Sequence, residues 1–284
     1  MKHSIFGASH PTTTRYPAAL HGLASDAGPD GVRVFWTDPA QTQCDLLKAQ
    51  TDFAAPTIET SQTLLKNARQ RFVFRHVLGK KSYVFKLFPL QFLPSRLKHP
   101  KYAYHEFSNM RLAADRGVPT PFPIAFLEKR RHGLVSCSGL IQQDLVGFSD
   151  LHAAARDKTL SNDKIMDHAS AAMCLMYDTG ANHIDLRDEN IMINLETAEW
   201  QIIDWQYASF VAPRAPWLLE YLVAYYIRLA PKDWRARLTS KWIPQVHSRS
   251  GHPDPLDLFT QRIAALGGRR NKVKHRLALH PVAI

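Results

Sequence analysis

The 284-residue chain contains only three cysteines, which are scattered and form no C-x-x-C pair. An odd set of this kind argues against a disulfide framework or a structural zinc site and favours a reducing compartment. No apolar run approaches the roughly 18 residues that a membrane-spanning helix needs. The N-terminal stretch also lacks the apolar core of a secretory signal. We therefore expect a cytoplasmic protein that does not cross a membrane.

Acidic residues are also few, since 25 Asp and Glu face 36 Lys and Arg and leave a formal net charge of +11. This excess favours anionic partners such as a nucleotide, a phosphorylated glycan or an acidic membrane surface, although a generally basic solvated surface gives the same count. No RNA- or DNA-binding motif accompanies the charge, so we expect no nucleic-acid partner. The basic cluster at 269–276 is either a solvated tail or a patch that meets an anionic membrane or glycolipid.

Hydrophobic residues make up 45% of the chain, enough for one large domain or for two lobes that share a cleft. Proline and glycine interrupt residues 1–58, which we predict to be an irregular extension packed on the first lobe, with at most one short strand at Val32–Trp36. Strand patterns then place a β-rich N-lobe at 59–143. A mainly helical C-lobe is predicted at 144–284.

The most informative stretch is His183-Ile184-Asp185-Leu186-Arg187-Asp188-Glu189-Asn190, whose H-x-D-L-x-x-x-N spacing is that of a kinase catalytic loop. Two apolar runs follow and predict a β-hairpin that ends on Asp204. Asp185, Asn190 and Asp204 would then meet at one point. Phosphoryl transfer needs one carboxylate to orient the attacking hydroxyl, and an amide and a second carboxylate to hold Mg²⁺. Any one of these residues alone would more often be a turn residue or a helix cap, so the combination supports the interpretation.

Two further residues of the loop are assigned to catalysis. His183 opens the motif, and Arg187 lies two positions after Asp185, where a cation would face the transferred phosphate and stabilise its charge. The alternative for Arg187 is a pairing with Asp188 or Glu189 that only closes the loop.

Lys86 lies inside an apolar strand pattern, which usually indicates an edge strand or a snorkelling side chain. Here it also fits the lysine that contacts nucleotide phosphates. A helix predicted at 101–114, and closed by Gly117, carries Glu106. Glu106 by itself would be a surface acid, but with Lys86 upstream we expect the two side chains to form an ion pair.

The glycine-rich loop that usually precedes such a lysine is missing. Residues 66–71 hold its place as Lys-Asn-Ala-Arg-Gln-Arg, without a glycine, so basic side chains would have to contact phosphate in place of the backbone. Residues 142–147 hold the place of an interlobe hinge. On position alone, Gln143 and Leu145 are predicted to contact the adenine edge of the nucleotide.

Taken together, Lys86, Glu106, the R-G-V-P-T-P of 116–121, the loop at 183–190 and the I-I-D-W of 202–205 resemble the kinase-like superfamily over roughly residues 64–230. The resemblance is greatest to its bacterial lipopolysaccharide-kinase branch, which phosphorylates Kdo or heptose. It implies an α+β, two-lobed protein-kinase-like fold, with ATP and Mg²⁺ as cofactors and a sugar hydroxyl of the lipopolysaccharide inner core as acceptor. The implied partners are an anionic glycolipid or phosphorylated sugar and the cytoplasmic face of the inner membrane.

Two departures separate the chain from protein kinases. Ile184 replaces the usual arginine of H-R-D, and too few residues follow Asp204 before a helix predicted from Trp217 to form an activation segment. Both features favour a glycan or small-molecule kinase. Two alternatives stay open: an aminoglycoside-type phosphotransferase, whose cationic substrates match the +11 charge poorly, and a non-catalytic kinase-like protein, which the retained motif residues argue against.

Overall fold

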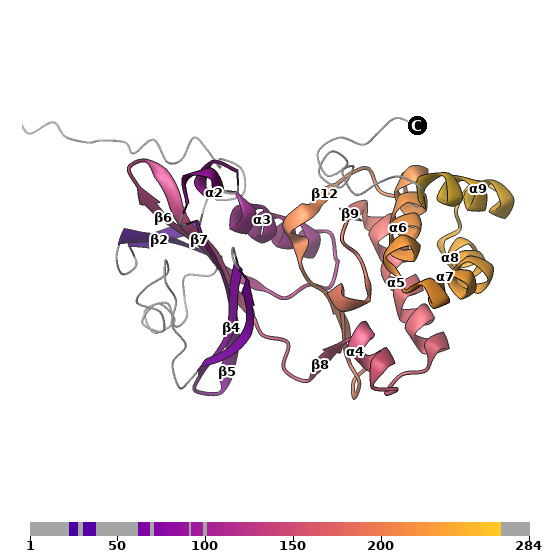
Figure 1. The fold of residues 1–284 in the computed structure, drawn as a ribbon, viewed down its shortest axis with the longest axis horizontal. Helices are drawn as coiled ribbons and strands as arrows, with labels where there is room; N and C mark the ends of the chain where they lie inside the picture. Colours follow the sequence, from indigo (N-terminus) through magenta and orange to yellow (C-terminus); the bar gives the residue numbers. More distant parts are fainter. Residues whose placement is uncertain are drawn as a thin grey trace, which may run out of the picture.

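The computed structural model describes residues 23–27, 31–37, 62–68, 71–90, 92–98 and 101–267, which form a β-rich N-lobe and a mainly helical C-lobe (Figure 1). The elements of the N-lobe are β1 (Ala24–Ala27), β2 (Val32–Trp36), β3 (Gln62–Ala68), β4 (Arg71–Leu78), β5 (Lys81–Pro89), α2 (Leu93–Lys98), α3 (Tyr102–Asp115), β6 (Pro123–Arg131) and β7 (Leu134–Gln143).

The C-lobe follows after the connection at residues 144–147. Its first elements are β8 (Phe148–Asp150), α4 (Leu151–Arg156), α5 (Asn162–Thr179), β9 (Ala181–His183), η2 (Asp188–Asn190), β10 (Ile191–Asn194) and β11 (Trp200–Ile202). The remaining elements are η3 (Trp205–Tyr207), β12 (Ala208–Phe210), α6 (Pro216–Leu229), α7 (Lys232–Arg237), η4 (Leu238–Trp242), α8 (Ile243–Ser250) and α9 (Leu256–Gly267). None of the helices in the described ranges is both long enough and apolar enough to cross a bilayer.

Among the described residues, seven strands form one antiparallel sheet in the order β1-β2-β6-β7-β5-β4-β3. β5 lies between β4 and β7, so Lys86 is opposite Val73 on one side and Leu140 on the other. Lys86 therefore occupies a central strand and not an edge strand. Because side chains alternate along a strand, Phe85 and Leu87 point into the apolar cluster on the other face, while Lys86 points toward α3.

The N-terminal segment is more regular than its composition indicates. β2 pairs along its length with β6, and the side chains of Val32, Val34 and Trp36 are buried. The short strand expected at Val32–Trp36 is confirmed and belongs to the main sheet, and β1 at Ala24–Ala27 is a second strand that the sequence did not predict. The strand that pairs with β2, β6, lies far along the chain, so the sequence shows the apolar alternation but not the pairing. The other residues of 1–58, apart from 23–27, 31 and 37, lie outside the described residues.

The helix that carries Glu106 matches its prediction closely, since α3 runs from Tyr102 to Asp115. It ends at Arg116, and Gly117 follows with a φ of +78° that suits glycine. Arg116 then donates from Nη1 to the carbonyl oxygens of Thr179 (2.8 Å) and Val211 (2.9 Å). This connector fastens the N-lobe helix to the C-lobe.

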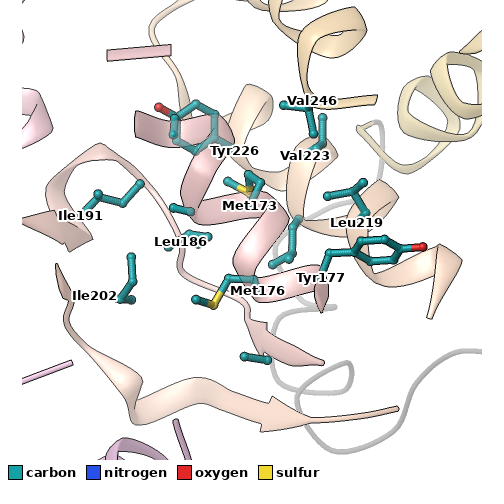
Figure 2. Packing of buried hydrophobic residues seen from close by; sticks show 14 of the residues in the cluster. Met173, Met176, Tyr177, Leu186, Ile191, Ile202, Leu219, Val223, Tyr226 and Val246 are labelled. Atoms are coloured by element: carbon teal, nitrogen blue, oxygen red, sulfur yellow. The ribbon is translucent and has the colours of Figure 1, made fainter. Parts of the chain in front are cut away.

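The core of the C-lobe is organised around α5. The helix begins after Ser161, whose Oγ accepts a hydrogen bond from the backbone of Lys164 (3.3 Å). Figure 2 shows the cluster around α5, to which the catalytic-loop residue Leu186 and the hairpin residues Ile191 and Ile202 also belong. The segments that carry the candidate site are therefore anchored in a packed core.

Beyond Pro231 the sequence pattern predicts no elements, whereas the structure contains α7, η4, α8 and α9 there. The buried residues that anchor them, such as Trp242 and Phe259, are widely spaced and separated by charged residues, which conceals the helical period. The basic cluster at 269–276 lies outside the described residues.

Gly180 ends α5 and leads directly into β9, with a φ of +68°. A Cβ at this position would lie 2.3 Å from the carbonyl oxygen of Val211. We expect Gly180→Ala to lower the free energy of unfolding by at least the roughly 1–3 kcal/mol of a strained backbone, because the clash adds to the strain. Urea denaturation measures this loss.

Gly133→Ala is the matched control for this substitution. Gly133 has a similar φ of +75°, but a Cβ there would meet nothing within 4 Å. Its variant should therefore lose less stability than Gly180→Ala. Equal losses would show that the close approach of Val211 does not matter.

Candidate active site

The catalytic-loop residues form a compact turn between β9 and β10. The backbone N–H of Leu186 donates to His183 (3.0 Å), and that of Asn190 donates to Arg187 (2.8 Å). Asn190 also donates from its side-chain Nδ2 to the backbone oxygen of Asp185, at 2.7 Å. Since the amide nitrogen is used in this way, the amide oxygen of Asn190 is the atom available to a metal ion.

The predicted hairpin is present, with Ile191 of β10 opposite Ile202 of β11. The N–H of Ile203 donates to the carbonyl oxygen of Asn190 (3.0 Å), which holds the end of the hairpin beside the loop. Asp204 follows with φ 65° and ψ 53°, a left-handed conformation that is rare for aspartate. Strained conformations of this kind concentrate at functional sites. The backbones that carry Asn190 and Asp204 are thus joined by the hydrogen bond between Ile203 and Asn190 and by the hairpin.

His183 joins the loop to the segment around Asp204. Its Nε2 forms a hydrogen bond with the carbonyl oxygen of Ile203 (2.9 Å). Its ring packs edge-on against the Trp205 ring, with the two ring centres 4.8 Å apart. Burial lowers the pKa of His183, against the opposing influence of the Ile203 carbonyl and of the Asp204 and Asp185 carboxylates. This buried imidazole thus holds the chain on both sides of Asp204, at Ile203 and Trp205.

Lys86 and Glu106 form a buried ion pair, with side chains that are only 9% and 0% exposed. The second oxygen of Glu106, Oε2, is buried without a hydrogen-bond partner. The positive charges of Lys86 and Arg71 both act on the Asp204 carboxylate. Burial raises the pKa of Asp204, but Lys86 and Arg71 outweigh that effect and hold the pKa below its ordinary value. Asp204 is therefore ionised at neutral pH.

Asn109 lies one helical turn after Glu106 on α3, on the same face. Its Nδ2 donates to the carbonyl oxygens of Trp205 and Ala208, each at 2.9 Å. The helix that presents Glu106 is thereby fixed to the segment that presents Asp204. Sequence reasoning missed Asn109, although an amide three residues after Glu106 on an apolar helix face was a visible signal.

Arg71 is a second residue whose role the sequence did not specify. It is the first residue of β4 and the last residue of the glycine-free stretch 66–71. Its Nη1 lies 3.4 Å from Oδ2 of Asp204, its Nη2 donates to Gln206, and its guanidinium lies 5.5 Å from the centre of the Phe88 ring. The guanidinium therefore reaches from the N-lobe sheet to the candidate metal ligand.

Arg187 forms the pairing that the sequence left open, since its Nη2 lies 2.7 Å from Oε2 of Glu189. Both side chains are well exposed, at 41% and 46%. Asp188 does not compete for Arg187 but accepts a hydrogen bond from the Tyr226 hydroxyl. Burial raises the pKa of Asp188, and the Tyr226 hydrogen bond offsets part of that rise.

The hinge residues lie apart from this cluster. Gln143 donates from its backbone to Phe122 (2.9 Å), and with Leu145 it lines a pocket of about 640 Å³. Within the described residues, that pocket is not lined by Lys86 or Asp204. The structure therefore brings together the predicted phosphate and metal residues, but it does not place the two hinge residues in one pocket with them.

Asp144, between the two predicted hinge residues, is the most constrained residue of the hinge. It accepts hydrogen bonds from Arg75 Nε (2.5 Å) and from Ser82 Oγ (2.7 Å). Its side chain is only 4% exposed. These contacts tie the hinge to β4 and β5. Sequence reasoning missed these contacts, because both partners come from a distant hairpin.

The donor atoms at Asp204 suit a magnesium ion and a polyphosphate. Oδ1 of Asp204 is buried without a hydrogen-bond partner, and Asn190, whose side-chain nitrogen donates to the Asp185 backbone, lies on the loop that the Ile203 N–H joins to this segment. Carboxylate and amide oxygens are ligands for hard divalent cations. Lys86 and Arg71 add two cationic groups that suit phosphate oxygens.

A sequence profile of the lipopolysaccharide kinase (Kdo/WaaP) family matches residues 86–237. The chain belongs to this family. The matched region begins at Lys86 and contains Glu106, the catalytic loop and Asp204, so the family assignment and the geometry concern the same residues.

Two relatives extend this comparison. The 3-deoxy-D-manno-octulosonic acid kinase of Vibrio cholerae serotype O1 (strain ATCC 39315 / El Tor Inaba N16961) is 30% identical over 103 residues, which cover 36% of this chain and 43% of the relative. The chain thus matches less than half the length of that relative. The solved structure of WaaP in complex with acyl carrier protein matches at a TM-score of 0.52 and 16% identity, over 76% of this chain and 87% of that one. At this identity the likeness establishes the α+β, two-lobed fold.

Proposed function

We propose that this chain is an ATP-dependent kinase that transfers the γ-phosphoryl group to a sugar hydroxyl of the lipopolysaccharide inner core. The main support is the buried Lys86–Glu106 pair beside Asp204, whose Oδ1 is buried and unsatisfied. Buried charges and unsatisfied carboxylate oxygens are costly. Their concentration at one point of a member of this family favours a working donor site over a non-catalytic scaffold.

Each residue has a defined role in this proposal. Lys86 binds nucleotide phosphate and is held by Glu106, while Asn190 and Asp204 hold Mg²⁺, which neutralises charge on the phosphoryl group when bound. Asp185 orients the acceptor hydroxyl and takes its proton late in the transfer. Gln143 and Leu145 are proposed to contact the adenine edge from the hinge.

The acceptor side favours a glycan over a protein. Residues 205–215, which follow Asp204, form η3 and β12, and Ala208 of β12 pairs with His183 of β9. This short path into α6 leaves no long segment that could bind a peptide substrate. The net charge of +11 suits an anionic, phosphorylated glycolipid and peripheral contact with the cytoplasmic face of the inner membrane.

A transfer assay with three acceptors tests this proposal. The purified chain is incubated with Mg²⁺ and γ-labelled ATP, and with Kdo-containing lipid A, a heptose-containing core oligosaccharide or kanamycin. We expect label on a core acceptor, less of it at high salt, and none on kanamycin. Transfer to kanamycin alone would assign an aminoglycoside-type activity. If the chain neither transfers label to any acceptor nor binds nucleotide, it has a non-catalytic role.

Arg187 is predicted to act on the transferred phosphoryl group. Its pair with Glu189 is exposed, so releasing it costs at most about 1 kcal/mol. Arg187→Ala should lower turnover about 10²- to 10³-fold, with little change in ATP affinity, because a guanidinium at this position stabilises charge that develops in the transition state. Steady-state kinetics and nucleotide titration measure the two effects separately.

Glu189→Ala is the matched control, since it breaks the same ion pair and keeps the arginine. It should leave turnover close to that of the wild type. If Arg187→Ala and Glu189→Ala lose thermal stability equally and both keep full turnover, Arg187 only closes the loop.

A further inference from the structure

The stretch of sequence that leads to the strand of Lys86 contains no glycine-rich phosphate loop. No glycine occurs between residues 62 and 78, which include β3 and β4 at the edge of the sheet. Only glycine lets backbone N–H groups wrap a phosphate closely without steric cost. A side chain must therefore make the contacts that a glycine-rich turn would make.

Arg71 is the side chain in the right place. The register of β4 with β5 puts Val73 opposite Lys86, and alternation along the strand puts Arg71 on the same face as Val73. The guanidinium lies over the Phe88 ring and reaches Asp204 and Gln206 across the lobes. Its side chain is 20% exposed, so one side of it remains open to a ligand.

The bond between Arg71 and Asp204 is weak for an arginine–carboxylate pair. Nη1 and Oδ2 are 3.4 Å apart, and Nη2 goes to Gln206 and not to the second oxygen of Asp204. A bidentate pair would have two contacts near 2.8 Å. The two carboxylates of Glu106 and Asp204 are balanced here by Lys86 and Arg71, so a metal ion that bound Asp204 would leave the Arg71 guanidinium in need of a new anion.

We propose that Arg71 is the phosphate clamp of the nucleotide site: it holds Asp204 when no nucleotide is bound and moves to the nucleotide phosphates when Asp204 binds the metal ion. This inference rests on the proposed kinase function. It assigns to one arginine the contacts that a glycine-rich loop would otherwise supply. A guanidinium fork suits this exchange, because it can bind a carboxylate or phosphate oxygens with the same two N–H groups.

Binding titrations of Mg·ATP and of adenosine test the clamp without any measurement of activity. Arg71→Ala should weaken Mg·ATP about 10- to 100-fold, which is the range expected for a lost charge-assisted hydrogen bond. Adenosine has no phosphate, so its affinity should not change. Arg71→Lys keeps the positive charge but loses the two-pronged guanidinium. Its affinity for Mg·ATP should lie between that of the wild type and that of Arg71→Ala.

Arg130→Ala is the matched control. Arg130 lies on the same sheet, is 22% exposed and pairs with Glu128 at 2.5 Å, but it belongs to β6, which β7 separates from β5, the strand of Lys86. Its variant should bind both ligands like the wild type. Binding of Mn²⁺ without nucleotide, measured by electron paramagnetic resonance, should be at least as tight in Arg71→Ala as in the wild type, because Asp204 is released.

Three results would overturn the clamp. If Arg71→Ala loses thermal stability but keeps the wild-type ratio of Mg·ATP to adenosine affinity, Arg71 is only a brace between the lobes. If the wild-type chain itself does not bind Mg·ATP, the proposed function fails together with the clamp. If the wild type binds Mg·ATP and transfers phosphate, but Arg71→Ala binds Mg·ATP equally well, the clamp is rejected and the proposed function stands.

Discussion

Asp185→Ala will lower turnover about 10²- to 10⁴-fold, the range expected when a positioned base is lost. The backbone oxygen of Asp185, and not its side chain, accepts the hydrogen bond from Asn190 (2.7 Å). The substitution therefore leaves Asn190 in place for the metal ion. Nucleotide affinity and thermal stability should stay near those of the wild type, so the loss should appear in turnover.

Asp185→Asn and Glu189→Ala refine this prediction. The first keeps the size of the side chain but cannot take a proton, so it should be nearly as slow as Asp185→Ala. The second removes an exposed acid from the same loop and should keep most of the turnover. A folded Asp185→Ala enzyme with wild-type turnover would show that the motif at 183–190 has been misassigned.

Lys86→Ala is expected to have the largest effect on the donor site. It leaves Glu106, which is fully buried, without its cation, and removal of one partner of a buried pair costs about 3–5 kcal/mol. Mg·ATP affinity should fall as well, because the phosphates lose a cationic contact. Chemical denaturation and nucleotide titration measure the two losses separately.

A double variant distinguishes stability from binding. Replacing both partners, as in Lys86→Met with Glu106→Leu, removes the unpaired charge and should recover much of the stability lost by Lys86→Ala. Mg·ATP affinity should not recover, because no cation returns. A double-mutant cycle at this pair should show coupling, and strictly additive losses would contradict the ion pair.

Local patterns predicted much of the site because its chemistry lies in short motifs. The H-x-D-L-x-x-x-N loop, the hairpin that ends on Asp204 and the helix around Glu106 each follow from spacing within one segment. Lys86 could be paired with Glu106 because kinase folds place the phosphate-contacting lysine one short loop before the helix that carries its glutamate. Ser161 and Gly180 cap the two ends of α5, and residues of these types at helix ends are local signals of the same kind.

Residues whose roles depend on distant partners could not be predicted. Arg71 was one of several basic residues in 66–71. The strand register puts both Lys66 and Arg71 on the face of Lys86, and only the contacts with Asp204 and Gln206 distinguish Arg71. Asp144 gains its hydrogen bonds from Arg75 and Ser82 on a distant hairpin, and β2 pairs with β6 far along the chain. Such contacts are set by tertiary packing, which local periodicity does not encode.

The most direct test of the account is a phosphate analysis of the lipopolysaccharide core from a strain in which this chain has been deleted. The deletion should remove a phosphate monoester from an inner-core sugar. The wild-type chain should restore it, and a stably expressed Asp185→Ala chain should not. A deletion strain whose core phosphate is unchanged would contradict the proposed function, as would full restoration by Asp185→Ala.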